Sequence, residues 1–286
     1  MQEVTRYRRP MLKRSALRYR LKTSIVRDLY WRMLGGRWID VRRREVEFYR
    51  ILLNGFRQGD LIFDVGANDG AKSDVFLRLG ARVVAIEPDD TNQDVLRSTF
   101  LRYRLVPRPV AIVGKALSDQ AGIETMWVDG PGSALNTLSQ KWVATLQNNK
   151  TRINNGHYGL DFGCHRAVET TTLEQLILTH GLPFFVKIDV EGYEASVLRG
   201  LKRPVPFLSF EVNLPEFRSE GLECVKLLQG LAAGSRFNYA VDCQCGLVLD
   251  KWVDGQDFLE LLQHCSENSI EVFWQSCLRC CAPTGP

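Results

Sequence analysis

Carboxylates stand at the ends of short apolar runs in this sequence, where they could bind a ligand or move a proton. Asp64 follows "LIF", Glu87 follows "RVVAI" and Asp189 follows "FFVKI". Glu191 comes two residues after Asp189, and Glu211 follows "FLSF". Such side chains accept hydrogen bonds from hydroxyl groups, attract cations and act as general bases. Their positions predict one site to which several strand ends contribute.

The segment "FDVGANDG" at 63–70 predicts a tight turn that leads from a strand into a helix. Gly66 and Gly70 would let the backbone approach a ligand closely, and the first N–H groups of the helix would point at the same place. Such a turn can also be purely structural. Glu87 argues for a ligand, because an acid at the end of the next strand can accept two hydrogen bonds from ribose hydroxyls.

The acid before the glycines indicates which nucleotide the turn would bind. A dinucleotide fold places a pyrophosphate at this helix, and the carboxylate of Asp64 would repel it. A ligand with an ammonium and a sulfonium group would be attracted instead. The sequence therefore predicts S-adenosylmethionine (SAM) as the cofactor and argues against NAD.

The elements that must position these residues alternate along the chain. Apolar runs at 61–65, 82–88 and 109–119 predict three strands, with helices between them that end at Gly80 and near residue 101. Further on, the pattern predicts a Thr-capped helix closed by Gly181, strands at 184–190 and 206–212, helices at 193–198 and 224–231, and late strands at 237–242 and 246–252. This alternation predicts a doubly wound (Rossmann-like) α/β fold with a mostly parallel seven-stranded sheet and helices on both faces.

Residues 120–170 interrupt the alternation and are rich in Gly and Asn. We expect an irregular insertion that covers the site as a lid. Within it, "HYGLDFGCHR" at 157–166 supplies aromatic, imidazole and guanidinium groups that could hold a sugar. His157 and His165 are candidate bases, although both could simply be solvated.

Six segments give the chain a resemblance to a known family. They are "FDVGANDG", "AIEPDD", "KALSDQAG", "VETTTLEQL", "VKIDVEGYEASVLRG" and "LSFEVN", in that order. Over about residues 44–213 the chain resembles the FkbM-type SAM-dependent methyltransferases, most of which are linked to O-methylation of sugars and secondary metabolites. The resemblance implies a class I methyltransferase fold and SAM as the cofactor.

The resemblance also implies roles for single residues. Those that would surround the methionine part of SAM are Asp64, Gly66, Ala67, Asn68 and Gly70. Glu87 would bind the ribose. Ser118 and Asp119 would lie beside the adenine ring, whose amine Asp119 could bind. Asp189, also near the cofactor, and Glu191 would flank the acceptor, with Glu211 as a third carboxylate on the same face.

Methyl transfer to an alcohol needs alignment and a base. Because the sulfonium is a good leaving group, positioning of the acceptor oxygen dominates. The candidate bases are Asp189, Glu191, His157 and His165. We favour the two carboxylates because a strand end fixes them. Asp189, Glu191 and Glu211 are also hard donors that could bind a divalent cation, but carboxylates at a SAM site more often hold ligands electrostatically, and no metal is expected.

Length and composition predict one domain with additions at both ends. The chain has 286 residues, of which 45% are hydrophobic. We expect a basic helical extension at 1–43, the methyltransferase domain at 44–260 and a Cys-containing tail at 261–286. No apolar stretch is long enough for a membrane span, so a cytoplasmic protein is expected. The eight cysteines are expected to be reduced thiols.

The first 50 residues differ in charge from the rest. They hold 15 Lys or Arg against 5 Asp or Glu, a charge of +10, whereas the remainder carries −6. Such a segment could contact an anionic surface or be a solvated cap. We expect a small-molecule or sugar acceptor and no clear nucleic-acid partner. Two alternatives stay open: an RNA methyltransferase that uses the basic segment, and a non-catalytic adaptor of the same fold at a membrane surface.

Overall fold

The computed structural model of the protein describes residues 37–100, 110–148, 160 and 162–276. The chain divides into two units, residues 1–43 and 44–286. Only the start of helix α3 (Arg37–Leu52) is described in the first unit, so most of the predicted basic extension lies outside the described residues. The second unit contains the sheet and the site.

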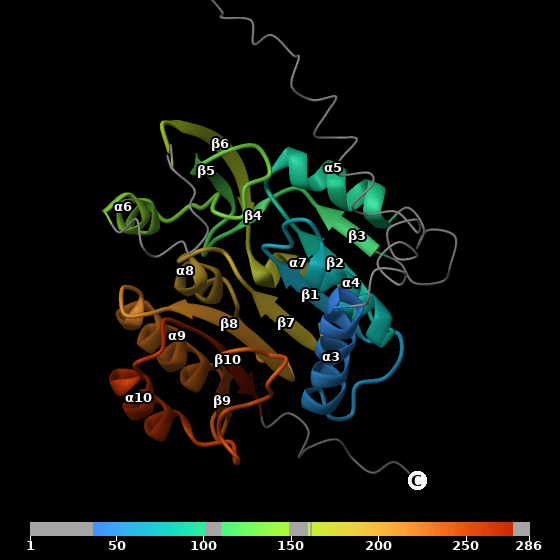
Figure 1. The fold of residues 1–286 in the computed structure, drawn as a ribbon, viewed down its shortest axis with the longest axis vertical. Coiled ribbons are helices and arrows are strands. Elements are labelled where there is room, and N and C mark those ends of the chain that lie inside the picture. The colour runs from blue at the N-terminus through green and yellow to red at the C-terminus, as the bar shows by residue number, and fades with distance from the viewer. Residues whose placement is uncertain (1–36, 101–109, 149–159, 161, 277–286) are drawn as a thin grey trace, which may run out of the picture. The chain divides into compact units, whose positions relative to one another are not determined.

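A seven-stranded sheet forms the centre of the second unit (Figure 1). Its order is β3-β2-β1-β7-β8-β10-β9, and only β10 runs antiparallel to its neighbours. The strands are β1 (Leu61–Val65), β2 (Arg82–Ile86), β3 (Val110–Val113), β7 (Phe185–Ile188), β8 (Phe207–Asn213), β9 (Arg236–Ala240) and β10 (Ser269–Gln275). The predicted fold class is confirmed.

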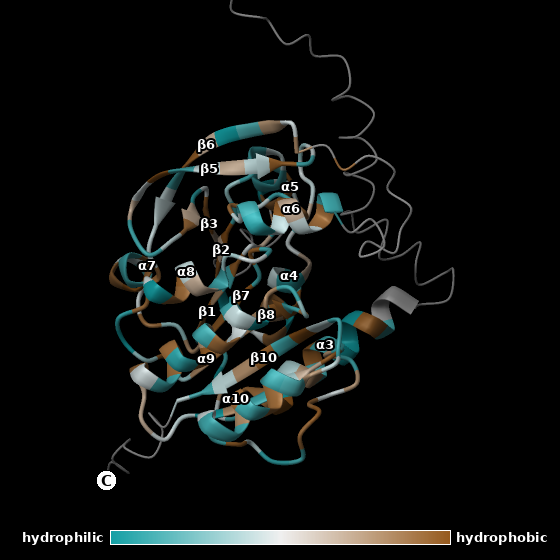
Figure 2. Ribbon diagram, turned by 90° about the vertical axis from the view of Figure 1, so that its left-hand side faces the viewer, coloured by the Kyte–Doolittle hydropathy of each residue, from teal (hydrophilic) through white to brown (hydrophobic). Residues whose placement is uncertain are grey.

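Helices cover both faces of this sheet because successive side chains of each strand point to opposite faces. Ile62 and Phe185 pack with α3, α4 (Ala71–Leu79) and α5 (Asp90–Thr99). Phe63 and Val186 pack with the opposite layer, which consists of α7 (Leu173–His180), α8 (Glu194–Arg199), α9 (Arg218–Leu231) and α10 (Gly255–His264). In Figure 2, α9 and α10 alternate hydrophilic and hydrophobic segments, as amphipathic helices do. None of the described helices is both long and apolar enough to span a bilayer.

The segment 120–170 is more regular than the sequence suggested. It contains β5 (Gly122–Val128), α6 (Gln140–Asn148) and β6 (Cys164–Thr171). These strands form a second sheet of order β4-β6-β5, in which β4 (Ala116–Leu117) pairs parallel to β6. The run 109–119 is therefore not one strand, because β3 belongs to the large sheet and β4 to the small one. Residues that pair across β5 and β6, such as Thr125 and Ala167, lie far apart in sequence, and local periodicity does not reveal such pairing.

The C-terminal region also corrects two expectations. Residues 246–252 form bends and irregular chain, and Val253 makes a single bridge to Phe237 of β9. The last strand among the described residues is β10, inside the segment predicted as a tail, and its Trp274 is fully buried. The domain thus extends beyond residue 260 because β10 fills the sheet position between β8 and β9.

The described cysteines are not joined by disulfides. Cys224, Cys243 and Cys265 are buried, and Cys164 and Cys245 are exposed. The Cys243 thiol donates a hydrogen bond to Glu271 Oε2 at 3.0 Å, and burial raises the pKa of this thiol. This environment disfavours the reactive thiolate. The cysteines after residue 276 lie outside the described residues.

Candidate active site

A cavity opens at the carboxyl ends of β1, β2 and β7, under part of the 120–170 segment. Its floor comes from residues that follow these three strands, which are Gly66, Asn68, Glu87, Pro88, Asp189 and Glu191. Its cover comes from the small sheet and the loop after β5, namely Met126 and residues 133, 134 and 136–138. Polar groups at strand ends beneath a cover are typical of ligand sites in doubly wound folds.

Gly66 brings the end of β1 against the end of β7. Its φ is +77°, and a Cβ at this position would lie 1.7 Å from the backbone oxygen of Asp189. Only glycine fits both the conformation and the space. The next residue but one, Asn68, has φ +47°, lines the cavity and donates its backbone N–H to Glu87 Oε2 at 2.8 Å.

Glu87 is held in place by backbone donors. Its Oε1 accepts the N–H of Asp89 at 2.8 Å, and its Oε2 accepts that of Asn68. Burial raises the pKa of Glu87 to about 7, against the lowering effect of these two bonds and of Arg166. Each carboxylate oxygen retains a lone pair. The side chain can therefore accept two hydroxyl donors from the cavity, as the predicted ribose contact requires.

Three of the predicted methionine-site residues lie elsewhere. Asp64 is on the face of β1 opposite to Val65, and its Oδ2 accepts a hydrogen bond from Ser73 at 2.6 Å. Its buried Oδ1 has no partner among the described residues, and burial raises its pKa. Ala67 is buried in the core. A Cβ on Gly70 would meet the side chains of Leu96 and Phe100 at 2.7 Å, so this glycine serves helix packing.

The predicted adenine contacts are also displaced. Ser118 is fully buried, its N–H donates to Thr171 O at 3.0 Å, and its hydroxyl donates to Asp119 Oδ1 at 3.3 Å. Neither residue lines the cavity in the described part of the chain. The preceding residues Ala116 and Leu117 of β4 line it instead. Strand β4 belongs to the small sheet, where it pairs with β6.

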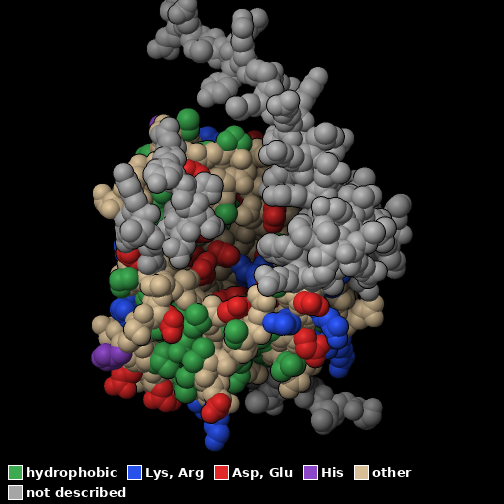
Figure 3. Space-filling model, in the orientation of Figure 1, with side chains coloured by type: hydrophobic (Ala, Val, Ile, Leu, Met, Phe, Trp, Pro, Cys, Tyr) green, Lys and Arg blue, Asp and Glu red, His purple; other side chains and the backbone are tan. Residues whose placement is uncertain are grey.

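The part of the cavity beside the end of β7 is acidic. One oxygen each of Asp189, Glu191 and Glu211 lies within 4.8 Å of the others. The buried Lys187 Nζ binds Asp189 Oδ2 at 2.7 Å. Figure 3 shows acidic side chains gathered in a hollow of the face seen in Figure 1, with basic side chains beside them. Such a cluster is stable only with internal hydrogen bonds, counter-charges or protonation.

These neighbours give the three carboxyl groups different pKa values. Burial acts to raise the pKa of Asp189, but Lys187 and a hydrogen bond with Glu211 hold it below its usual value. Burial and the charge of Asp189 raise the pKa of Glu211 to about 8. The same two effects, with the charge of Glu211, raise that of Glu191 well above its usual value. At neutral pH Asp189 is the ionised member and Glu211 is mostly protonated.

The backbone at Glu191 is strained and held from two sides. Its φ of +55° is uncommon for a residue other than glycine. The hydroxyl of Thr137 donates to the Glu191 carbonyl at 2.8 Å. Glu194 Oε1 accepts the N–H groups of Val190 and Gly192 at 3.1 and 3.2 Å. These contacts keep the Glu191 side chain near Asp189.

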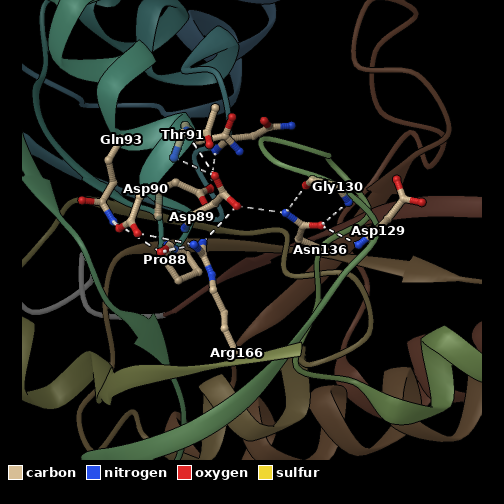
Figure 4. A network of polar contacts seen from close by, with 12 residues as sticks. Pro88, Asp89, Asp90, Thr91, Gln93, Asp129, Gly130, Asn136 and Arg166 are labelled. Atoms are coloured by element: carbon tan, nitrogen blue, oxygen red, sulfur yellow. Dashed lines mark hydrogen bonds and ion pairs between the residues drawn. The ribbon is translucent and has the colours of Figure 1, made fainter. Parts of the chain in front are cut away.

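The described candidates of the 120–170 segment, His165 and Arg166, do not line the cavity. His165 is exposed on β6 and packs on Trp127, with ring centroids 5.5 Å apart, and His157 lies outside the described residues. Arg166, which was expected to be available for a sugar, is engaged elsewhere. Its guanidinium binds Asp89 at 3.0 Å (Figure 4).

Lys187 and Asn136 are among the residues of the site that were not predicted. Lys187 interrupts the apolar strand "FFVKI", and a charge in a buried strand requires a partner. This signal could have indicated the pair with Asp189. Asn136 lines the cavity and lies in a Gly/Ser/Asn-rich loop, where the sequence offers no comparable signal.

The cavity suits the predicted cofactor. Gly66 provides a close backbone approach that a Cβ would fill, and Glu87 provides two acceptors for ribose hydroxyls. Ile86, Leu117 and Met126 add apolar surface for a purine ring. Asp189 and Glu191 provide negative charge or polar acceptors for the ammonium and sulfonium groups of SAM.

Comparison with known proteins identifies the family. The family model for the methyltransferase FkbM domain matches residues 64–246, more than half of the chain. No curated protein matches in sequence. Similar solved structures include the C-terminal domain of precorrin-6Y C5,15-methyltransferase from Rhodobacter capsulatus (16% identity, 79% of this chain and 84% of that chain, TM-score 0.37). Another is a TehB-like SAM-dependent methyltransferase from Corynebacterium glutamicum (7% identity, 87% and 99%, TM-score 0.42). At these TM-scores neither likeness carries an argument about the substrate.

Proposed function

The chain belongs to the FkbM family of SAM-dependent methyltransferases, and from this premise we propose that it methylates a hydroxyl oxygen of a small molecule, sugar or glycan. SAM supplies an activated methyl group on a sulfonium. The observation that carries the proposal is the place of Asp189 at the end of β7, where it contacts Lys187 and lies beside the carboxyl groups of Glu191 and Glu211. A hydroxyl acceptor must lose a proton during transfer, and this cluster offers a place for it.

Asp189 is the proposed proton acceptor. It lines the cavity directly after β7, where the strand fixes its backbone. Lys187 keeps it ionised through the 2.7 Å contact. The same contact makes Asp189 a weak base, so we propose that it accepts a hydrogen bond from the hydroxyl first and takes the proton late in the reaction. Alignment of the acceptor oxygen then contributes more than base strength.

Glu211 and Glu191 support this arrangement in different ways. Glu211 is placed by Ser269, whose hydroxyl donates to Oε1 at 2.7 Å. In its protonated form Glu211 can donate to Asp189, which orients that carboxylate. Glu191 lines the cavity on the acceptor side, where a protonated carboxyl group can both donate to and accept from a polyhydroxylated ligand.

The cover over the cavity fits a compact acceptor. Residues from β5 and the following loop close one side. Tyr193 lines the same cavity, and its hydroxyl donates to Glu124 of β5 at 2.6 Å. Exclusion of water strengthens the electrostatic contacts inside and protects the methyl donor.

A panel of acceptors tests the proposal. The protein is incubated with SAM and with sugars, glycosides, aliphatic alcohols, phenols, primary amines and RNA, and mass spectrometry locates the methyl group. We expect methyl ethers. In Asp189→Asn, turnover on that acceptor should fall about 10²- to 10⁴-fold, while Asp257→Asn on the exposed start of α10 should retain it. Methylation of the amines or of RNA in place of hydroxyl groups would refute O-methylation.

A further inference from the structure

Asp89 is a buried carboxylate that joins three segments of the chain. It caps α5, and its Oδ1 accepts the N–H groups of Thr91 and Asn92 at 2.8 and 3.2 Å. Its Oδ2 accepts Arg166 Nη2 from β6 at 3.0 Å and Asn136 Nδ2 from the loop after β5 at 3.1 Å. The side chain is only 2% exposed. Figure 4 shows both donors converging on it.

Each of the two donors, Arg166 and Asn136, also makes further hydrogen bonds. The Arg166 guanidinium reaches Pro88 O and Asp90 Oδ2, each at 3.4 Å. Asn136 folds its loop, since its Oδ1 accepts the N–H of Asp129 at 3.0 Å and its Nδ2 donates to Gly130 O at 3.0 Å. Residues 88–90 therefore make polar contacts both with the small sheet and with the loop after β5.

Asp89 is connected to the cofactor site through its backbone N–H group. The N–H of Asp89 donates to Glu87 Oε1 at 2.8 Å, and Glu87, Pro88 and Asn136 line the cavity. A shift of Asp89 would move the donor that orients Glu87 and would change the wall formed by Pro88. The Asp89 side chain does not line the cavity in the described part of the chain.

We propose that Arg166 and Asn136 are positioning residues of the cofactor site, which act by holding Asp89 and thereby the turn that aims Glu87 into the cavity. This role concerns the cofactor alone and holds for any acceptor. It assigns to the 120–170 segment a function in cofactor affinity as well as in covering the site.

Binding of S-adenosylhomocysteine (SAH), measured by calorimetry, tests this role without an acceptor. Arg166→Gln and Asn136→Ala should each weaken binding about 3- to 10-fold, the size of effect expected from the loss of the hydrogen bond to Asp89. Arg203→Gln is the matched control, because Arg203 pairs with Glu174 and neither residue lines the cavity. Thermal melting checks that each variant is folded.

The pH dependence of binding separates positioning from a purely structural contribution. An ionised Glu87 accepts stronger hydrogen bonds from ribose hydroxyls, so affinity should rise with pH through about 7, the pKa of Glu87. The charged groups near Glu87 are Asp89 and Arg166, with Lys115, Asp189 and Glu191 on the same cavity. Because Arg166 lowers the pKa of Glu87, the midpoint should move to higher pH in Arg166→Gln.

One further variant, together with Asn136→Ala, completes the test. Arg166→Lys keeps the charge but not the forked geometry, so it should restore the pH midpoint and only part of the affinity. Asn136→Ala should weaken SAH binding and leave the pH midpoint of binding unchanged. It provides the test of the proposal if Arg166→Gln does not fold. SAH affinities and midpoints equal to those of the wild-type protein in both Arg166→Gln and Asn136→Ala would overturn the proposal. Failure of the wild-type protein to bind SAH would overturn it together with the cofactor assignment.

Discussion

The two ends of the cavity hold their carboxylates by different means. At the cofactor end, one carboxylate, Glu87, is fixed by backbone N–H groups of Asn68 and Asp89. At the acceptor end, Asp189, Glu191 and Glu211 crowd together and depend on Lys187 and on shared protons. Backbone donors give a position that changes little with conditions, whereas a coupled charge cluster responds to pH and to the ligand. The first suits an invariant cofactor and the second a reacting group.

Removal of Lys187 should have the largest effect on the free energy of unfolding. Lys187→Met leaves Asp189, Asp64 and Glu271 without their buried counter-charge. Loss of one partner of a buried pair costs about 3–5 kcal/mol, which urea denaturation would measure. Lys251→Met, at an exposed position, is the control. A cost below about 1 kcal/mol would mean that the carboxylates do not depend on Lys187.

Gly66→Ala should disturb both ends at once, with a somewhat smaller effect. The added Cβ would collide with the Asp189 backbone oxygen, in addition to strain at φ +77°. We expect a loss of about 2–3 kcal/mol in the free energy of unfolding. Gly59→Ala isolates the strain, because Gly59 has φ +92° and no atom within 4 Å of the added Cβ. Equal losses in the two variants would show that the ends are not in contact.

The pH dependence of stability tests the acceptor end alone. The folded pKa of Glu211, about 8, lies above its ordinary value of 4.5. Between these values the unfolded chain binds fewer protons than the folded one, so the contribution of Glu211 falls as pH rises from about 4.5 to 8 and is constant above that. Glu211→Gln should therefore lose less stability than the wild-type protein between pH 5 and 8 in urea titrations.

The exposed Glu260→Gln is the control for this prediction. If the stability of Glu211→Gln declined with pH as steeply as that of the wild-type protein, this result would contradict the protonated state of Glu211. The titration of Asp189 does not interfere with this measurement. Its pKa is lowered from 3.8, so its contribution to stability changes only in more acidic solution.

The sequence predicted the features that depend on local pattern. The order of β1, α4, β2 and β7 follows from apolar runs and glycines, and Gly66, Asn68, Glu87, Asp189 and Glu191 do line one cavity. Asp64 does not line this cavity, because alternation on β1 turns its side chain to Ser73, and its predicted contact with the cofactor stays a prediction.

Features that depend on distant pairing were not predictable from the sequence. β10 completes the large sheet from within the supposed tail, and β4 leaves it to pair with β6, which takes Ser118 and Asp119 away from the cavity. Arg166 finds its partner Asp89 in a segment 77 residues earlier. No local periodicity encodes such contacts, since tertiary context decides them.

Calorimetric titration of SAH into the wild-type protein and Glu87→Ala tests the central claim most directly. The claim is that Glu87 holds the cofactor at the end of the cavity away from the acceptor carboxylates. Loss of two hydrogen bonds to a charged group should weaken binding about 10- to 100-fold, in a variant that still unfolds cooperatively, and NAD should bind to neither protein. Equal SAH affinities of the two folded proteins would contradict the placement of the cofactor.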